Sequence, residues 1–258
     1  MPEPGIPARP INDMLNRRLL RKSNLPTGDP LYRLLELLCT DSVYVLRDEF
    51  DDGLNGRWET RGFQLQEGNL EGVLATVQDS DEPEEGDRYI ISTKSGWRPK
   101  RRACVQMKGA FGFATVQSKL EFGFAHSNGS PNGCLWVSGT TDARNPHVPH
   151  FYLAVRDTIN ASRFDLAVAS NNTLSVVDAT PATAVSGNTN FTLLLATNEQ
   201  GEARLWVNGI HDNSVVRAGT GNVGADLRIW LHLLNRLGGG VNLSVDYIQA
   251  WQERADMP

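Results

Sequence analysis

The sequence predicts an all-β fold, a two-sheet antiparallel sandwich of the jelly-roll type, preceded by a helical arm at the N-terminus. Residues 114–122 alternate between apolar and polar side chains, with Ser118 in the apolar phase, and this is the period of a strand with one buried face and one exposed face. Between residues 43 and 253, short apolar runs follow one another with turn-forming residues between them. Helical spacing of apolar residues occurs before residue 42. We therefore expect an arm of residues 1–42 and a β domain of residues 43–258.

The composition indicates a sizeable core and no nucleic-acid partner. Of the 258 residues, 40% are apolar and 21% are charged, which suits one large β domain with an extension. The net charge of −5 is opposite in sign to the surface that binds nucleic acid. Cys39, Cys104 and Cys134 lack metal-site spacing, so we expect buried free thiols, with a thiol nucleophile as the lesser alternative.

The arm begins with a proline-rich stretch that lacks the apolar run of a secretory signal. Nowhere does the chain contain the roughly 20 apolar residues that cross a bilayer. We expect synthesis in a host cytoplasm, no signal peptide and no membrane insertion.

Two short helices are predicted in the arm, one within residues 11–22 and one that begins with Asp29 as N-cap and Pro30 as its first residue. Helices of about 10 residues are marginal alone in water, so their apolar faces must pack against something. That partner is either the arm's own sandwich or a different chain. The docking face consists of leucines, namely Leu15, Leu19, Leu31, Leu34, Leu35 and Leu38.

The expected strands of the β domain follow the apolar runs in order. An Asn171–Asn172 turn marks a hairpin, and Asn208–Gly209 closes another strand. Besides the central pair described next, the runs lie at residues 43–46, 63–66, 72–77, 88–93, 151–155, 164–168, 174–177, 191–196, 203–207, 227–234 and 241–251.

The centre of the sandwich is predicted at residues 110–139, where a long amphipathic strand, a polar loop and a short strand at residues 134–137 follow one another. The phase of the long strand predicts one buried set of side chains and one exposed set. The buried set is Ala114, Val116, Leu120 and Phe122, and the exposed set is Thr115, Gln117 and Lys119.

Five motifs in the expected order carry a family resemblance. They are Asp48-Glu49-Phe50 with Leu54 and Trp58, Phe111-Gly112 leading into residues 114–120, Asn132–Trp136, Phe191–Gly209, and Gly238–Gln252 with its Val245-Asp246-Tyr247-Ile248. Together they resemble the concanavalin A-like lectin and glucanase jelly rolls, especially the laminarinase-type glycoside hydrolases. The resemblance covers about residues 43–253 and implies the same sandwich.

The resemblance extends to the fold of those hydrolases but not to their catalytic residues. The family carries an E-x-D-x-x-E motif, because retaining hydrolysis needs two carboxylates about 5–5.5 Å apart. The corresponding stretch here, residues 147–157, holds the single carboxylate of Asp157. We therefore expect no enzyme activity. The resemblance further implies that calcium, the one candidate cofactor, would bind near Asp246.

Four aromatic side chains are candidates for a sugar-stacking platform on a concave sheet, with core packing as the alternative for each. They are Trp97, Trp136, Tyr152 and Trp230.

Two interpretations of function stay open. In the first, the chain is a non-catalytic structural protein of a virion, such as a phage capsid decoration or a tail component. It would display a lectin-like jelly roll and bind other virion proteins, or copies of itself, through the arm. In the second, it is a carbohydrate-binding module or a divergent glycoside hydrolase. Both hold together if an exposed virion protein binds cell-surface glycans.

Overall fold

The computed structural model describes residues 43–50, 56–65, 74–76, 86–111, 118–126, 135, 150–157, 164–170, 173–177, 190–211, 216–217, 224–235 and 243–253. The predicted arm lies outside these ranges, together with all six of its docking leucines. Its helices and its docking role therefore stay predictions.

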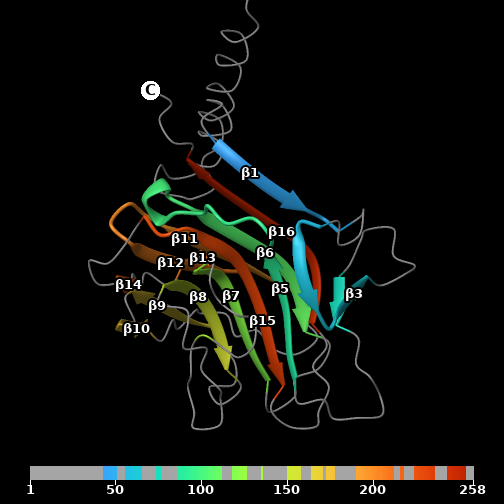
Figure 1. Ribbon diagram of the computed structural model, residues 1–258. Helices are drawn as coiled ribbons and strands as arrows, with labels where there is room; N and C mark the ends of the chain where they lie inside the picture. The colour runs from blue at the N-terminus through green and yellow to red at the C-terminus, as the bar shows by residue number, and fades with distance from the viewer. Residues whose placement is uncertain are drawn as a thin grey trace, which may run out of the picture.

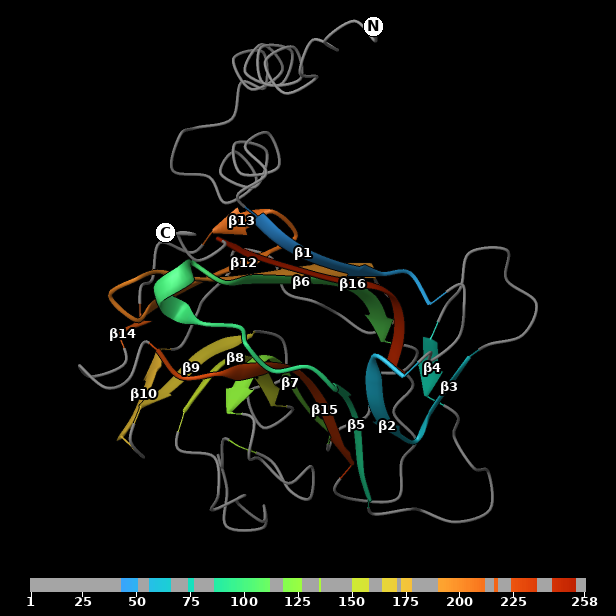
Figure 2. The same ribbon diagram turned by 45° about the horizontal axis from the view of Figure 1, so that its top comes forward.

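Two antiparallel sheets form a sandwich, which confirms the predicted two-layer fold (Figures 1 and 2). Sheet A contains β1 (Val43–Asp48), β3 (Phe63–Leu65), β4 (Leu74–Thr76), β6 (Cys104–Phe111), β11 (Asn190–Thr197), β12 (Glu202–Val207), β13 (Ile210–His211), β14 (Val216–Arg217) and β16 (Leu243–Glu253). Sheet B contains β2 (Trp58–Arg61), β5 (Gly86–Ser92), β7 (Ser118–His126), β8 (Phe151–Asp157), β9 (Asp165–Ser170), β10 (Thr173–Val177) and β15 (Leu227–Asn235).

Strands distant in sequence lie side by side in both sheets. The order in sheet B is β10-β9-β8-β7-β15-β5-β2, and β6 lies between β11 and β16 in sheet A. The expected hairpin at Asn171–Asn172 is confirmed by the pairing of β9 with β10, in which Ser170 faces Thr173. Within the described ranges the only helix is the short 3-10 turn η1 (Pro99–Arg101). No helix there has the length and hydrophobicity needed to cross a membrane.

The main core lies between the sheets and takes large apolar side chains from both. Each such residue contributes about 1.5–3 kcal/mol when its side chain is fully buried. Sheet A contributes Met107, Leu193, Leu195 and Ile248 among others, and sheet B contributes Leu120, Phe122, Phe124 and Leu231.

The face assignment of β7 is correct, but the expectation of an exposed second face is wrong. Leu120 and Phe122 point into the main core, as predicted. Lys119 lies on the opposite face and yet has no exposed surface. A second apolar cluster around Trp230 and Leu135 covers that face. Residues 114–117 lie outside the described ranges, and of residues 134–137 only Leu135 is described.

In the last strand the sequence predicts one face made of Val241, Leu243, Val245, Tyr247 and Trp251, and the structure keeps this alternation only as far as Val245. A bulge between Val245 and Tyr247 shifts the register of β16 against β6, so Asp246 has no partner residue in the pairing. Beyond the bulge, Ile248 and Ala250 face the core. Trp251, which the alternation placed with Val245, instead packs with Cys104 in a third cluster on the outer face of sheet A.

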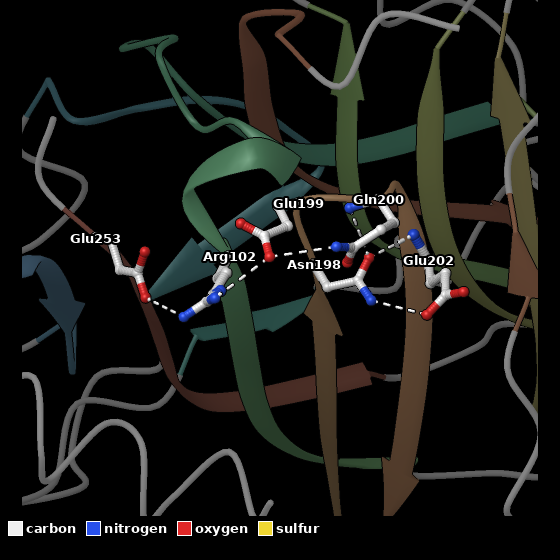
Figure 3. A network of polar contacts seen from close by, with 6 residues as sticks. All are labelled: Arg102, Asn198, Glu199, Gln200, Glu202 and Glu253. Atoms are coloured by element: carbon white, nitrogen blue, oxygen red, sulfur yellow. Dashed lines mark hydrogen bonds and ion pairs between the residues drawn. The ribbon is translucent and has the colours of Figure 1, made fainter. Parts of the chain in front are cut away.

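Polar contacts join three segments at one end of sheet A (Figure 3). Arg102, in a left-handed conformation after η1, contacts Glu253 at 2.9 Å and Glu199 at 3.4 Å. Asn198 closes the β11–β12 turn, because its side-chain carbonyl accepts from the backbone N–H groups of Gln200 and Glu202. The network therefore ties η1, this turn and the end of β16 together.

Candidate functional site

The outer face of sheet B, the face turned away from sheet A, is the candidate site. Directly paired residues of neighbouring strands share a face. His232 pairs with Glu121, and Glu121 pairs with Val155, so one row of side chains crosses β15, β7 and β8. The row continues from His232 to Tyr89 and Arg61 on one side. Charged and aromatic groups therefore lie together on the face of sheet B that the alternation of residues 114–122 predicted to be exposed.

Glu121 is the centre of a buried polar cluster on this face. Its carboxylate accepts the backbone N–H of Leu135 at 3.0 Å and the indole N–H of Trp230 at 3.3 Å. The ammonium of Lys119 lies 3.5 Å from Oε1, and Nδ1 of His232 lies 4.0 Å from Oε2. Lys119, Glu121 and His232 have no exposed surface.

Two aspartates join Glu121 on the same face. Asp157 pairs directly with Lys119, and Asp165 pairs with Val155, which is itself the partner of Glu121. Both aspartates are 1% exposed. Along the chain, the stretch of residues 147–157 holds only Asp157, so the sequence gives no sign of the other two carboxylates. These three come from β7, β8 and β9, and only the strand register brings them together.

The exposed end of the face lies over β2 and β5. Tyr89 is half-buried against the Trp230 cluster, and its strand neighbour Arg61 is exposed. Burial, and then the negative charge of Glu59, raise the pKa of Tyr89, while Arg61 acts in the opposite direction. Arg228 contacts Glu59 at 3.5 Å. We call Glu59, Arg61, Tyr89 and Arg228 the β2–β5 rim.

A pair of histidines lies where β7 ends and β8 begins. The rings of His126 and His150 are 5.7 Å apart, and the backbone N–H of His126 donates to the carbonyl of His150. Burial, followed by the proximity of His126, lowers the pKa of His150. Close by, Arg98 binds Asp226 at 2.6 Å and is the largest cause of the lowered pKa of that carboxyl.

The described members of the predicted aromatic platform do not form one surface. Trp97 and Tyr152 lie in the main core between the sheets, and burial raises the pKa of Tyr152 to about 12. Trp230 lies on the opposite face of sheet B with Glu121. None of the three is more than 3% exposed, which matches the core alternative rather than a platform. Trp136 lies outside the described residues.

Asp246, the predicted calcium ligand, forms an ion pair with Lys108 beside the bulge of β16. A calcium ion takes 6–8 oxygen ligands, and a lysine ammonium already neutralises this carboxylate. The described part of the chain contains no cluster of three or more histidine, cysteine, aspartate or glutamate residues placed to hold a metal. The surroundings of Asp246 among these residues therefore do not fit a calcium site.

Comparison with known proteins identifies the fold of this chain, but it identifies no sequence family. No family model and no curated protein sequence matches the chain. Solved structures do match over most of its length, at low sequence identity. Peanut lectin matches with a TM-score of 0.57 at 11% identity, covering 83% of this chain and 99% of the lectin.

Two enzymes match in the same way. A family 16 endo-glucanase from Bacteroides ovatus gives a TM-score of 0.53 at 10% identity, covering 79% of this chain and 98% of the enzyme. A β-glucanase from Bacillus licheniformis gives 0.52 at 10% identity, covering 81% of this chain and 98% of the enzyme. The fold is thus the concanavalin A-like jelly roll that the motifs predicted, and its structural neighbours include both lectins and glucanases.

Proposed function

We propose that this chain is a non-catalytic carbohydrate-binding protein, and that its binding surface is the β2–β5 rim on the outer face of sheet B. The observation that carries the proposal is the half-buried ring of Tyr89 among the charged groups of Glu59, Arg61 and Arg228. Support comes from the fold, because its structural neighbours include peanut lectin and glucanases. Together these features favour a surface that holds a sugar by stacking and by hydrogen bonds.

The chemistry of the rim suits a sugar. An aromatic ring with one apolar face and a polar hydroxyl offers a stacking surface and a hydrogen-bonding tip. Guanidinium groups donate and carboxylates accept, so the rim can pair with hydroxyl groups that do both. The Arg228–Glu59 contact also holds two of these side chains in place before a ligand arrives. Such prior ordering lowers the entropic cost of binding.

The test is a glycan array with the full chain, followed by calorimetric titration of the best ligand. Tyr89→Ala should weaken binding about tenfold, or about 1.4 kcal/mol, because the stacking ring is lost. Tyr247→Ala is the matched control, since Tyr247 is a partly buried tyrosine beside Arg47 on sheet A. Equal loss in both variants, or no binding to any glycan, would contradict the proposal.

Catalysis is not part of the proposal, although three carboxylates share the face. Glycoside hydrolysis needs a carboxyl group that reaches the scissile oxygen and a second one at a defined separation. Glu121 instead is enclosed, with its oxygens occupied by Lys119, Trp230 and the backbone of Leu135. We therefore propose that this cluster has a structural role and stabilises the outer face of sheet B.

We further propose that the protein is a virion component, either a capsid decoration or a tail component, and that residues 1–42 attach it to the virion. The leucines at helical spacing in that segment support it, because short helices need a partner surface. Light scattering coupled to size exclusion, on the full chain and on residues 43–258, tests attachment. We expect assembly only with the arm. A monomeric full chain would argue against the virion role and leave the carbohydrate role in place.

A further inference from the structure

Lys119 and Asp157 lie directly opposite each other in neighbouring antiparallel strands, on the outer face of sheet B. Lys119 has no exposed surface and Asp157 is 1% exposed. Opposed residues have Cβ atoms about 4.5–5.5 Å apart, which is within reach of a lysine side chain with its four-carbon stem. The fold therefore holds an amine and a carboxyl group beside each other where water is excluded.

Glu121 adds a third group to this pair. It follows Lys119 by two residues on the same face, and its Oε1 lies 3.5 Å from Nζ of Lys119. The backbone N–H of Leu135 and the indole of Trp230 hold the carboxylate in that position. A carboxylate fixed beside an amine is placed to accept a proton from it. The three residues thus supply a nucleophile, an electrophile and a proton carrier.

We propose that Lys119 and Asp157 condense to an isopeptide bond, and that Glu121 carries the protons. The lone pair of the neutral Nζ attacks Cγ of the protonated Asp157 carboxyl group and forms the N–C bond. Glu121 takes a proton from Nζ and delivers it to the departing hydroxyl, which leaves as water when the C–O bond breaks. One ammonium and one carboxylate become one amide and one water, so no oxidant or cofactor is consumed.

The surroundings favour the amide over the ion pair. Two buried charges carry a large desolvation cost, and a neutral amide relieves it. The nearby groups that face the triad are His232, at 4.0 Å from Glu121, and Asp165 on the next strand along. Exclusion of water also protects the product from hydrolysis. The bond would tie β7 to β8 and constrain the unfolded chain as a disulfide does.

The test is the intact mass of the denatured full-length chain. The wild type should be lighter than its sequence by the mass of one water molecule. Lys119→Met and Glu121→Gln should each have the full sequence mass, because they remove the nucleophile and the proton carrier. Lys108→Met is the matched control, since Lys108 pairs with Asp246 on the partly exposed outer face of sheet A, and it should retain the mass deficit.

Peptide mapping locates the bond. Trypsin should fail to cut after Lys119 and should release residues 109–144 linked to residues 157–163. A wild-type chain of full sequence mass overturns the proposal whether or not the variants fold. A mass deficit confined to residues 109–144, with a free peptide 157–163, would place the bond elsewhere and overturn the assignment to Asp157.

Discussion

Glu121 places a carboxylate where no solvent reaches it, and it is surrounded by Nζ of Lys119 at 3.5 Å and by two N–H donors. Such an arrangement is costly to disturb, because removal of one partner leaves the others buried without compensation. The same residue links β7 to β15 through Trp230 and to the segment that contains Leu135. At the scale of single residues, this carboxylate is the main polar contact that holds the outer face of sheet B.

Replacing Glu121 with alanine should therefore lower the free energy of unfolding by about 3 kcal/mol or more, measured by urea denaturation. The matched control is Glu199→Ala. Glu199 lies 3.4 Å from Arg102, and the side chain of Glu199 is 52% exposed. That change should stay within about 0.5 kcal/mol of wild type. Comparable losses in the two variants would show that the buried cluster has no special role.

His150 gives the stability a dependence on pH. Its pKa is lowered in the folded state, so between the folded and unfolded pKa values the unfolded chain binds more protons. The free energy of unfolding should fall as the pH drops below about 6.5, the ordinary pKa of histidine. His150→Gln should flatten this fall below about pH 6.5 in urea titrations. His211→Gln, on sheet A, should retain it, and a flat wild-type profile would count against the argument.

Among the strands, the β7–β8 pair depends on a glycine. Gly123 has φ +154°, and a Cβ added there would lie 2.1 Å from the carbonyl oxygen of Tyr152 in the neighbouring strand. No rotation of a flexible side chain can relieve a contact with backbone. Gly56 also has positive φ, at +67°, but nothing lies within 4 Å of its added Cβ.

Gly123→Ala should thus destabilise the protein by more than about 3 kcal/mol, because β8 must move away from β7. Gly56→Ala should cost only the conformational strain, about 1 kcal/mol. Thermal and urea unfolding of both variants measure the difference. Similar costs at the two positions would mean that the close approach of β7 and β8 does not limit the fold.

The strands and turns were largely predictable, because alternation and turn residues are local signals. Residues 191–196, for example, are apolar on both parities, which is typical of a strand covered on both faces, and Leu193 and Leu194 are buried on opposite faces. The bulge at Asp246 was missed, although Ile248, Gln249 and Ala250 already reverse the alternation of β16 in the sequence. The pairing with β6 shows the consequence, which is an outward-facing Trp251.

The polar cluster could not be predicted for a related reason. Glu121, Asp157 and Asp165 come from three strands, and only the pairing register brings them to one face. Lys119 was expected in solvent, because strand alternation cannot reveal a second layer of cover. The described aromatic candidates were expected on a binding surface but are buried in apolar cores. Large aromatic rings occur in cores as well as in binding surfaces, so residue type alone did not distinguish the two.

The whole molecule is a jelly roll whose neighbours in structure include both lectins and glucanases, so fold alone does not decide between binding and catalysis. The decision rests on the outer face of sheet B. Its buried centre is occupied by Glu121 and the side chains that contact it, Lys119 and Trp230, and its exposed end is the β2–β5 rim. We therefore treat the buried centre as structural and the β2–β5 rim as the proposed ligand-binding surface.

We expect no release of reducing sugar when the chain is incubated with laminarin-, agar- or carrageenan-type polymers. The reason is that residues 147–157, which correspond to the hydrolase motif, hold only the buried carboxylate of Asp157, and that Glu121 is enclosed by Lys119 and Trp230. Activity that disappears in Asp157→Asn or Glu121→Gln, in protein that is still folded, would place the protein among the enzymes.

Hydrogen–deuterium exchange of the full chain, with and without its best oligosaccharide, can locate the carbohydrate-binding surface. We expect the ligand to slow exchange in β2 and β5, residues 58–61 and 86–92, where Glu59, Arg61 and Tyr89 lie. Exchange in β6 and β16 of sheet A should not change. Protection confined to sheet A, with β2 and β5 unaffected, would contradict the assignment of the binding surface.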